Sequence, residues 1–107
     1  MEVKVKTVEE LKQMMDGDVE FQLIDVREEY EYDICNLEGE LIPLGTVPDY
    51  VDSIHRDRPV IVYCRSGARS ARAVQFLQEQ GGFDNLYNLE GGVKAWAERI
   101  DPSMPTY

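Results

Sequence analysis

Residues 60–77 read VIVYCRSGARSARAVQFL, and this stretch predicts a strand, a loop and a helix in that order. The apolar run 60–63 predicts a buried strand that ends at Cys64. A short loop of small and cationic residues follows, and residues 71–77 then carry apolar side chains at helical spacing. A strand, a loop and a helix in this order place the Cys64 thiol at the start of a helix. Unpaired backbone N–H groups and the helix dipole favour an anion there.

This position predicts a reactive cysteine. Cysteines at helix N-termini and beside arginines become thiolates near neutral pH, and the thiolate is the nucleophile. Arg65 and Arg69 supply the nearby positive charge. The structural alternative is a core cysteine that packs as a small hydrophobe. A core cysteine has no need of two arginines and a glycine within five residues, so we favour a nucleophilic Cys64.

Composition limits the function classes. The chain has 107 residues, of which 43% are hydrophobic and 30% charged, and this size fits one domain with one core. The net charge of −10 comes from 21 acidic and 11 basic residues, which argues against binding to nucleic acid or to an anionic membrane. A small basic pocket within an acidic surface is still allowed, and the loop with Arg65 and Arg69 fits one.

The two cysteines, Cys35 and Cys64, are expected to be free thiols in a reducing cytoplasm. The sequence shows no secretory leader and no apolar run of membrane-spanning length. The single histidine, His55, and two distant cysteines make no recognisable set of metal ligands. We therefore expect no metal and no cofactor.

Outside residues 60–77, strands and helices continue to alternate. Thr7 and Glu10 form a capping-box pattern, followed by a helical apolar stripe that stops near Gly17. In chain order we expect strands at 3–5, 21–26, 41–43, 60–63 and 86–89, a helical turn at 28–32, helices over 8–16, 47–54, 69–80 and 93–98, and an extended tail at 101–107.

This alternation predicts an α/β fold with a parallel five-stranded sheet and helices on both faces. In such sheets, sites lie outside the carboxyl ends of the strands. Cys64 and Asp25 both lie at predicted strand ends, so the site is expected at that edge of the sheet.

Three motifs resemble those of the rhodanese family of sulfurtransferases. The loop CRSGARS at 64–70 is similar to its active-site loop, IDVRE at 24–28 to its N-terminal signature, and NLEGGVKAW at 88–96 to its C-terminal signature. The three motifs occur in the family's order, and the resemblance spans residues 1–107 as a single rhodanese domain. It implies the three-layer rhodanese-like fold.

One segment departs from the usual family pattern. The family commonly has His-Ile-Pro-Gly after the second strand, whereas this chain has NLEG at 36–39, preceded by DIC at 33–35. Together with the ending DPSMP at 101–105, this variant most resembles the rhodanese domain joined to MoeB/ThiF-type activating enzymes. The resemblance leaves the partner open, with a sulfur-carrier protein, a desulfurase and thioredoxin as candidates. It also leaves open whether the chain is a stand-alone protein or a domain of a longer one.

The resemblance implies a two-step covalent mechanism. The Cys64 thiolate takes the outer sulfur of a small anionic donor such as thiosulfate, and a nucleophilic acceptor removes it from the resulting persulfide. Backbone N–H groups of the loop would surround the persulfide, with Arg69 on the donor's sulfonate and Arg65 at the pocket mouth. The predicted persulfide-binding and substrate-binding residues are Arg65, Ser66, Gly67, Ala68, Arg69 and Ser70.

Other residues receive structural roles. Asp25 and Arg27 are expected to support the site through hydrogen bonds and a salt bridge, with catalysis as the alternative. Cys35 is expected to be a passive thiol, with attack on the persulfide as the alternative.

Two other functions compete with sulfur transfer. A cysteine phosphatase uses a Cys-x5-Arg loop, whereas only four residues separate Cys64 from Arg69, which makes a cradle tight for phosphate. An inactive rhodanese-like module that binds a partner protein is the non-enzymatic alternative. Such modules often lack the cysteine, which is present here.

Overall fold

A parallel β-sheet forms the centre of the computed structural model, which describes residues 2–107. Within these residues, five strands lie in the order β1-β5-β4-β2-β3, and each neighbouring pair is parallel. The strands are β1 (Val5–Lys6), β2 (Gln22–Asp25), β3 (Glu40–Leu41), β4 (Val60–Tyr63) and β5 (Leu86–Leu89). The predicted α/β fold with a parallel five-stranded sheet is therefore confirmed.

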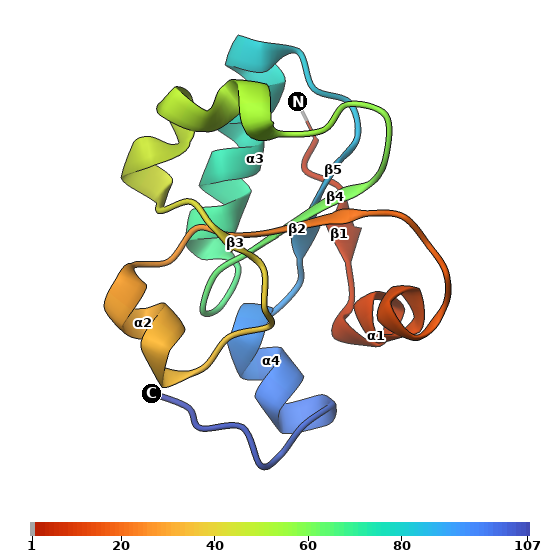
Figure 1. The fold of residues 1–107 in the computed structure, drawn as a ribbon, viewed down its shortest axis with the longest axis vertical. Helices are drawn as coiled ribbons and strands as arrows, with labels where there is room; N and C mark the ends of the chain where they lie inside the picture. The colour runs from red at the N-terminus through yellow and green to blue at the C-terminus, as the bar shows by residue number, and fades with distance from the viewer. Residues whose placement is uncertain (1) are drawn as a thin grey trace.

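Helices cover both faces of the sheet (Figure 1). Side chains alternate along β4: Val60 and Val62 pack with α3 and η1, whereas Ile61 and Tyr63 pack with α1 and α4. The helical elements are α1 (Val8–Asp16), α2 (Glu29–Ile34), the 3₁₀ helix η1 (Leu44–Ser53), α3 (Ala68–Gly81) and α4 (Gly92–Arg99). Between residues 2 and 107, none of these helices combines the length and apolar character that a membrane span requires.

Local sequence signals explain where α1 begins and where α3 ends. The Thr7 hydroxyl accepts from the N–H of Glu10 at 3.1 Å, and the Glu10 carboxylate accepts from the N–H of Thr7 at 2.8 Å, so the capping box at α1 is confirmed. Gly82, at φ +67°, ends α3 in the left-handed conformation that glycine tolerates.

Several segments differ from the sequence-based expectations; the third strand, for example, lies at Glu40–Leu41 rather than 41–43. The helical spacing at 47–54 belongs to a 3₁₀ helix, in which Pro48 lacks the N–H that a regular α-helix needs. The first strand lies at Val5–Lys6 rather than 3–5. The tail is not extended throughout, because Met104 N–H donates to the Asp101 carbonyl and closes a turn.

The buried Arg27 side chain connects the end of β2 to the end of α2. The Arg27 guanidinium lies 2.8 Å from the Asp25 carboxylate, and both side chains are fully buried. Arg27 also donates to the main-chain carbonyl of Cys35 at 2.7 Å, just after α2. The carboxyl edge of the sheet is thus held to α2 by one charged side chain.

We predict that Asp25→Ala strongly destabilises the fold. Removing one partner leaves the Arg27 charge buried and unpaired, which costs about 3–5 kcal/mol. Urea-induced unfolding measures the change. Asp16→Ala is the matched control, because it breaks the exposed Lys12–Asp16 pair, and such pairs contribute about 0–1 kcal/mol. Equal losses in both variants would contradict a structural role for Asp25.

Candidate active site

Cys64 follows β4 directly and lies against the first turn of α3. Its residue is 1% exposed. The Sγ atom accepts from the N–H of Gly67 at 3.1 Å and from the N–H of Ser70 at 3.4 Å, and the Ser70 hydroxyl lies 3.3 Å away. Gly67 is the N-cap of α3, so the donors come from the helix N-terminus, as the sequence pattern predicts.

These contacts favour the thiolate. Burial raises the pKa of Cys64, but hydrogen bonds from the Ser70 hydroxyl and from the N–H groups of Ser70, Gly67 and Ser66 outweigh it and hold the pKa below its ordinary value. The sequence predicted the backbone N–H groups as well as the helix dipole and the two arginines, whereas the Ser70 hydroxyl adds a side-chain donor.

Asn88 of β5 holds the loop through two side-chain hydrogen bonds. Its side-chain N–H donates to the Gly67 carbonyl at 3.0 Å, and its side-chain oxygen bonds the Ser70 hydroxyl. A hydroxyl has a single proton, so Ser70 offers it either to Asn88 or to the Cys64 sulfur. Sequence reasoning included Asn88 only within a motif. A polar side chain inside the otherwise apolar strand β5 was the available signal.

The N-terminus of α4 holds the outer side of the loop. Val93 N–H donates to the Cys64 carbonyl, and Lys94 N–H to the Arg65 carbonyl, both at 3.0 Å. Gly92 lies at φ +58°, and a Cβ there would come within 2.4 Å of the Cys64 carbonyl oxygen. Only glycine lets α4 approach so closely. The loop therefore directs N–H groups at the sulfur while α4 binds two of its carbonyls.

The two loop arginines already have partners. Arg69 forms a two-pronged ion pair with Glu31 of α2, at 2.7 and 2.8 Å. Arg65, on the exposed side of the loop, donates to the main-chain oxygen of Tyr107. Of the other predicted loop residues, Ser66 and Ala68 are exposed. Neither Glu31 nor Tyr107 was identified from the sequence.

Glu31 is buried and ionised. The Arg69 guanidinium, helped by the Tyr107 hydroxyl and the N–H of Glu28, lowers the pKa of Glu31 to about 2 against the opposing effect of burial. The positive charge of Arg69 is therefore balanced within the protein by the Glu31 carboxylate.

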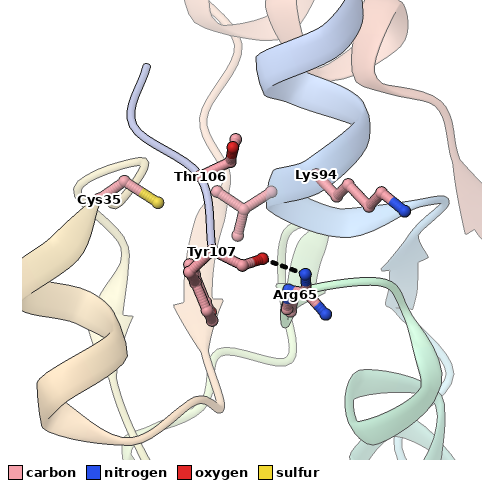
Figure 2. Close-up of a pocket in the computed structure, with 6 residues that line it drawn as sticks. Cys35, Arg65, Lys94, Thr106 and Tyr107 are labelled. Carbon is pink, nitrogen blue, oxygen red and sulfur yellow. Dashed lines mark hydrogen bonds between the residues drawn. The ribbon is translucent and has the colours of Figure 1, made fainter.

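A pocket beside the loop contains the second cysteine (Figure 2). Its lining residues are Cys35, Arg65, Val93, Lys94, Thr106 and Tyr107. Cys35 and Cys64 are both free thiols. Figure 2 shows Cys35 and Arg65 on opposite sides of the chain at Tyr107. The second cysteine therefore belongs to the outer pocket, whereas Cys64 lies inside the loop.

Comparisons with known proteins agree on one family. The family model described as rhodanese-like domain matches residues 7–99. The chain is 42% identical to rhodanese-like/PpiC domain-containing protein 12 of Arabidopsis thaliana, over 98% of this chain and 38% of that protein. It is 35% identical to the probable adenylyltransferase/sulfurtransferase MoeZ of Mycobacterium tuberculosis, over 94% of this chain and 26% of that protein. This chain thus spans well under half of either relative.

Two further relatives are similar in size. The putative sulfurtransferase YtwF of Bacillus subtilis is 36% identical, with 95% of this chain and 98% of that protein covered. The crystal structure of a rhodanese-like domain protein from Staphylococcus aureus has 35% identity and a TM-score of 0.79, over 88% of this chain and 91% of that chain.

We predict that the Cys64 thiol titrates below the free value of about 8.5. Ser70→Ala should raise this pKa by about one unit, because a hydrogen bond to a charged group contributes about 1.5 kcal/mol and one pKa unit corresponds to about 1.4 kcal/mol. The rate of iodoacetamide alkylation against pH, in a Cys35→Ser background, measures the midpoint. Ser66→Ala is the control, because it keeps the backbone N–H. A wild-type midpoint at or above the free value would refute the prediction.

The lowered pKa of Glu31 predicts how the free energy of unfolding depends on pH. Its pKa falls from 4.5 to about 2 on folding, so the carboxylate stabilises the protein fully above about pH 4.5 and progressively less as the pH falls towards 2. Glu31→Gln should lower the free energy of unfolding at pH 7 by about 1–3 kcal/mol and flatten its acid dependence. Urea unfolding at several pH values measures both. Glu29→Gln, on the same helix but exposed, should leave the acid dependence unchanged. An identical acid slope in Glu31→Gln and wild type would contradict the assignment.

Proposed function

Because this chain belongs to the rhodanese-like domain family, among relatives named as sulfurtransferases, we propose that it transfers sulfane sulfur through a persulfide on Cys64. The donor is a small sulfur-bearing anion such as thiosulfate, and the acceptor is a nucleophile. The observation that carries the proposal is the set of donors around Cys64 Sγ: two backbone N–H groups and one hydroxyl within 3.4 Å. Such donors stabilise an anionic sulfur without a metal or cofactor.

The first step forms the persulfide. The Cys64 thiolate attacks the outer sulfur of thiosulfate, and a new S–S bond forms. The bond between the two thiosulfate sulfurs breaks, and its electron pair leaves with sulfite. One anion on the enzyme replaces another, so the N–H groups of Gly67 and Ser70 stabilise negative charge before and after the step.

The second step returns the enzyme to its starting state. A nucleophilic acceptor attacks the terminal sulfur of the persulfide, and the S–S bond to Cys64 breaks with its electrons on the Cys64 sulfur. Cyanide would leave as thiocyanate, and a thiolate as a persulfide. The thiolate that departs is the one that the loop already stabilises, which makes Cys64 a good leaving group.

The loop residues divide between sulfur and donor. Gly67 and Ser70 contact the sulfur, and the N–H of Ser66 contributes to its lowered pKa. Arg65 is exposed, so it can draw an anionic donor to a site on an otherwise acidic protein. Arg69 keeps its proposed link to the donor only indirectly, because Glu31 occupies its guanidinium.

The relatives support a protein acceptor or donor. MoeZ of Mycobacterium tuberculosis carries adenylyltransferase and sulfurtransferase in one name, which fits a sulfur-carrier protein as acceptor. A desulfurase as donor and thioredoxin as acceptor are the other candidates. Residues 1–107 form a single rhodanese domain in this proposal, which the similar length of the Bacillus relative supports. Two free thiols fit a reducing cytoplasm.

The geometry favours sulfur over phosphate. Four residues separate Cys64 from Arg69, and Glu31 neutralises the arginine that a phosphatase would direct at a phosphate dianion. The donors at 3.1–3.4 Å surround a single sulfur atom. This geometry therefore favours a sulfurtransferase over a phosphatase.

We predict that thiosulfate adds the mass of one sulfur atom to the peptide that contains Cys64. Cys64→Ser should abolish the label and turnover, and Cys35→Ser should retain both, because backbone N–H groups surround the Cys64 sulfur, whereas Arg27 approaches the Cys35 sulfur only to 3.9 Å. Peptide mass spectrometry and thiocyanate formation from cyanide measure the two outcomes. A label mainly on the Cys35 peptide would refute the assignment, and a folded wild type without label or turnover would favour the inactive binding module.

A further inference from the structure

Tyr107 links three elements around the site. Its hydroxyl accepts from Arg27 at 2.8 Å and donates to the Glu31 carboxylate at 2.7 Å. The same carboxylate holds Arg69. These partners lie 80 and 76 residues away along the chain, at the end of β2 and in α2. The tyrosine side chain therefore anchors the tail to Arg27 and to Glu31, the residue that pairs with Arg69.

The main chain of Tyr107 contacts the active-site loop. Its main-chain oxygen accepts from the Arg65 guanidinium, as Figure 2 shows. The guanidinium carbon of Arg65 also lies 5.1 Å from the centre of the tyrosine ring. One residue thus engages both arginines of the loop, Arg65 directly and Arg69 through Glu31.

This arrangement sets up a competition. Arg65 is the exposed cation of the loop, and part of its guanidinium is committed to the Tyr107 oxygen. An anionic donor that binds Arg65 in the same direction has to displace that oxygen. A neutral reagent makes no such demand, because it gains nothing from the guanidinium.

We propose that Tyr107 is a specificity-determining residue: its main-chain oxygen competes with anionic reagents for Arg65 and so lowers the preference of the Cys64 site for anionic over neutral reagents. The proposal rests on the proposed function in taking Cys64 as the reacting atom and the donor as an anion. Tyr107 lies outside residues 7–99 that match the family model, so the preference is a property of this chain's tail.

The test compares two alkylating reagents of similar size at Cys64, anionic iodoacetate and neutral iodoacetamide. All proteins carry Cys35→Ser, so that only Cys64 reacts. Tyr107→Ala removes the ring and hydroxyl that anchor the tail, which frees Arg65. Because a single exposed hydrogen bond contributes modestly, the iodoacetate-to-iodoacetamide rate ratio should rise about two- to fivefold. The KM for thiosulfate should fall by a similar factor, with kcat little changed.

Three variants make the result specific. Tyr30→Ala removes an exposed tyrosine of α2 and should leave the ratio unchanged. Tyr107→Phe loses only the anchoring hydroxyl and should raise the ratio by less than Tyr107→Ala. Arg65→Gln combined with Tyr107→Ala should remove the gain, because the freed cation is gone. Circular dichroism checks that each variant is folded.

The outcomes separate this proposal from the proposed function. An unchanged ratio in both folded Tyr107 variants overturns the competition, and so does a gain that persists when Arg65 is replaced. The alkylation ratio needs no sulfur transfer, so it tests Tyr107 even if thiosulfate is not a donor. Conversely, persulfide formation with an unchanged ratio would sustain the function and refute the role of Tyr107.

Discussion

The buried charge of Arg27 holds together the elements that surround the Cys64 loop. Arg27 is fully buried, and a guanidinium in such a place needs a counter-charge and partners for its N–H groups. Asp25 supplies the charge, the Cys35 carbonyl accepts from one side, and the Tyr107 hydroxyl accepts from another. The strand end, α2 and the tail therefore converge on a single side chain, and the Glu31 carboxylate is held where it can meet Arg69.

The loop around Cys64 depends on a second constraint: its backbone N–H groups and its carbonyls must find partners on opposite sides. N–H groups turn inward to Cys64, and two carbonyls turn outward to the first turn of α4. Neither arrangement satisfies the loop alone, because a buried carbonyl without a donor costs about 1–3 kcal/mol and a buried anion without donors costs more. Gly92, the first residue of α4, is therefore part of this arrangement, although it lies in another part of the sequence.

Local sequence signals predicted the Cys64 loop and the elements on either side of it, but not Glu31 and Tyr107, which pair with its arginines. The apolar run before Cys64 and the helical stripe after it place the thiol at a helix N-terminus, and the rhodanese resemblance is confirmed by the family match. Glu31 pairs with Arg69 from 38 residues away and Tyr107 with Arg65 from 42, and such pairs leave no periodic pattern. We therefore expected both arginines to be free for substrate. At 47–54, the apolar spacing alone did not distinguish a 3₁₀ helix from an α-helix, although Pro48 was a signal against the α-helix.

The source of the Cys64 acidity bears on how the protein responds to ionic strength. Mobile ions screen exposed charges over about 8 Å at physiological salt but do not enter a buried hydrogen-bonded pocket. Cys64 is held by N–H groups and a hydroxyl inside the loop, whereas Arg65 faces the solvent. On the proposed chemistry, electrolyte would therefore weaken the arrival of an anionic donor while leaving the nucleophile itself intact. The encounter and the bond-forming step thus respond separately to the salt content of the medium.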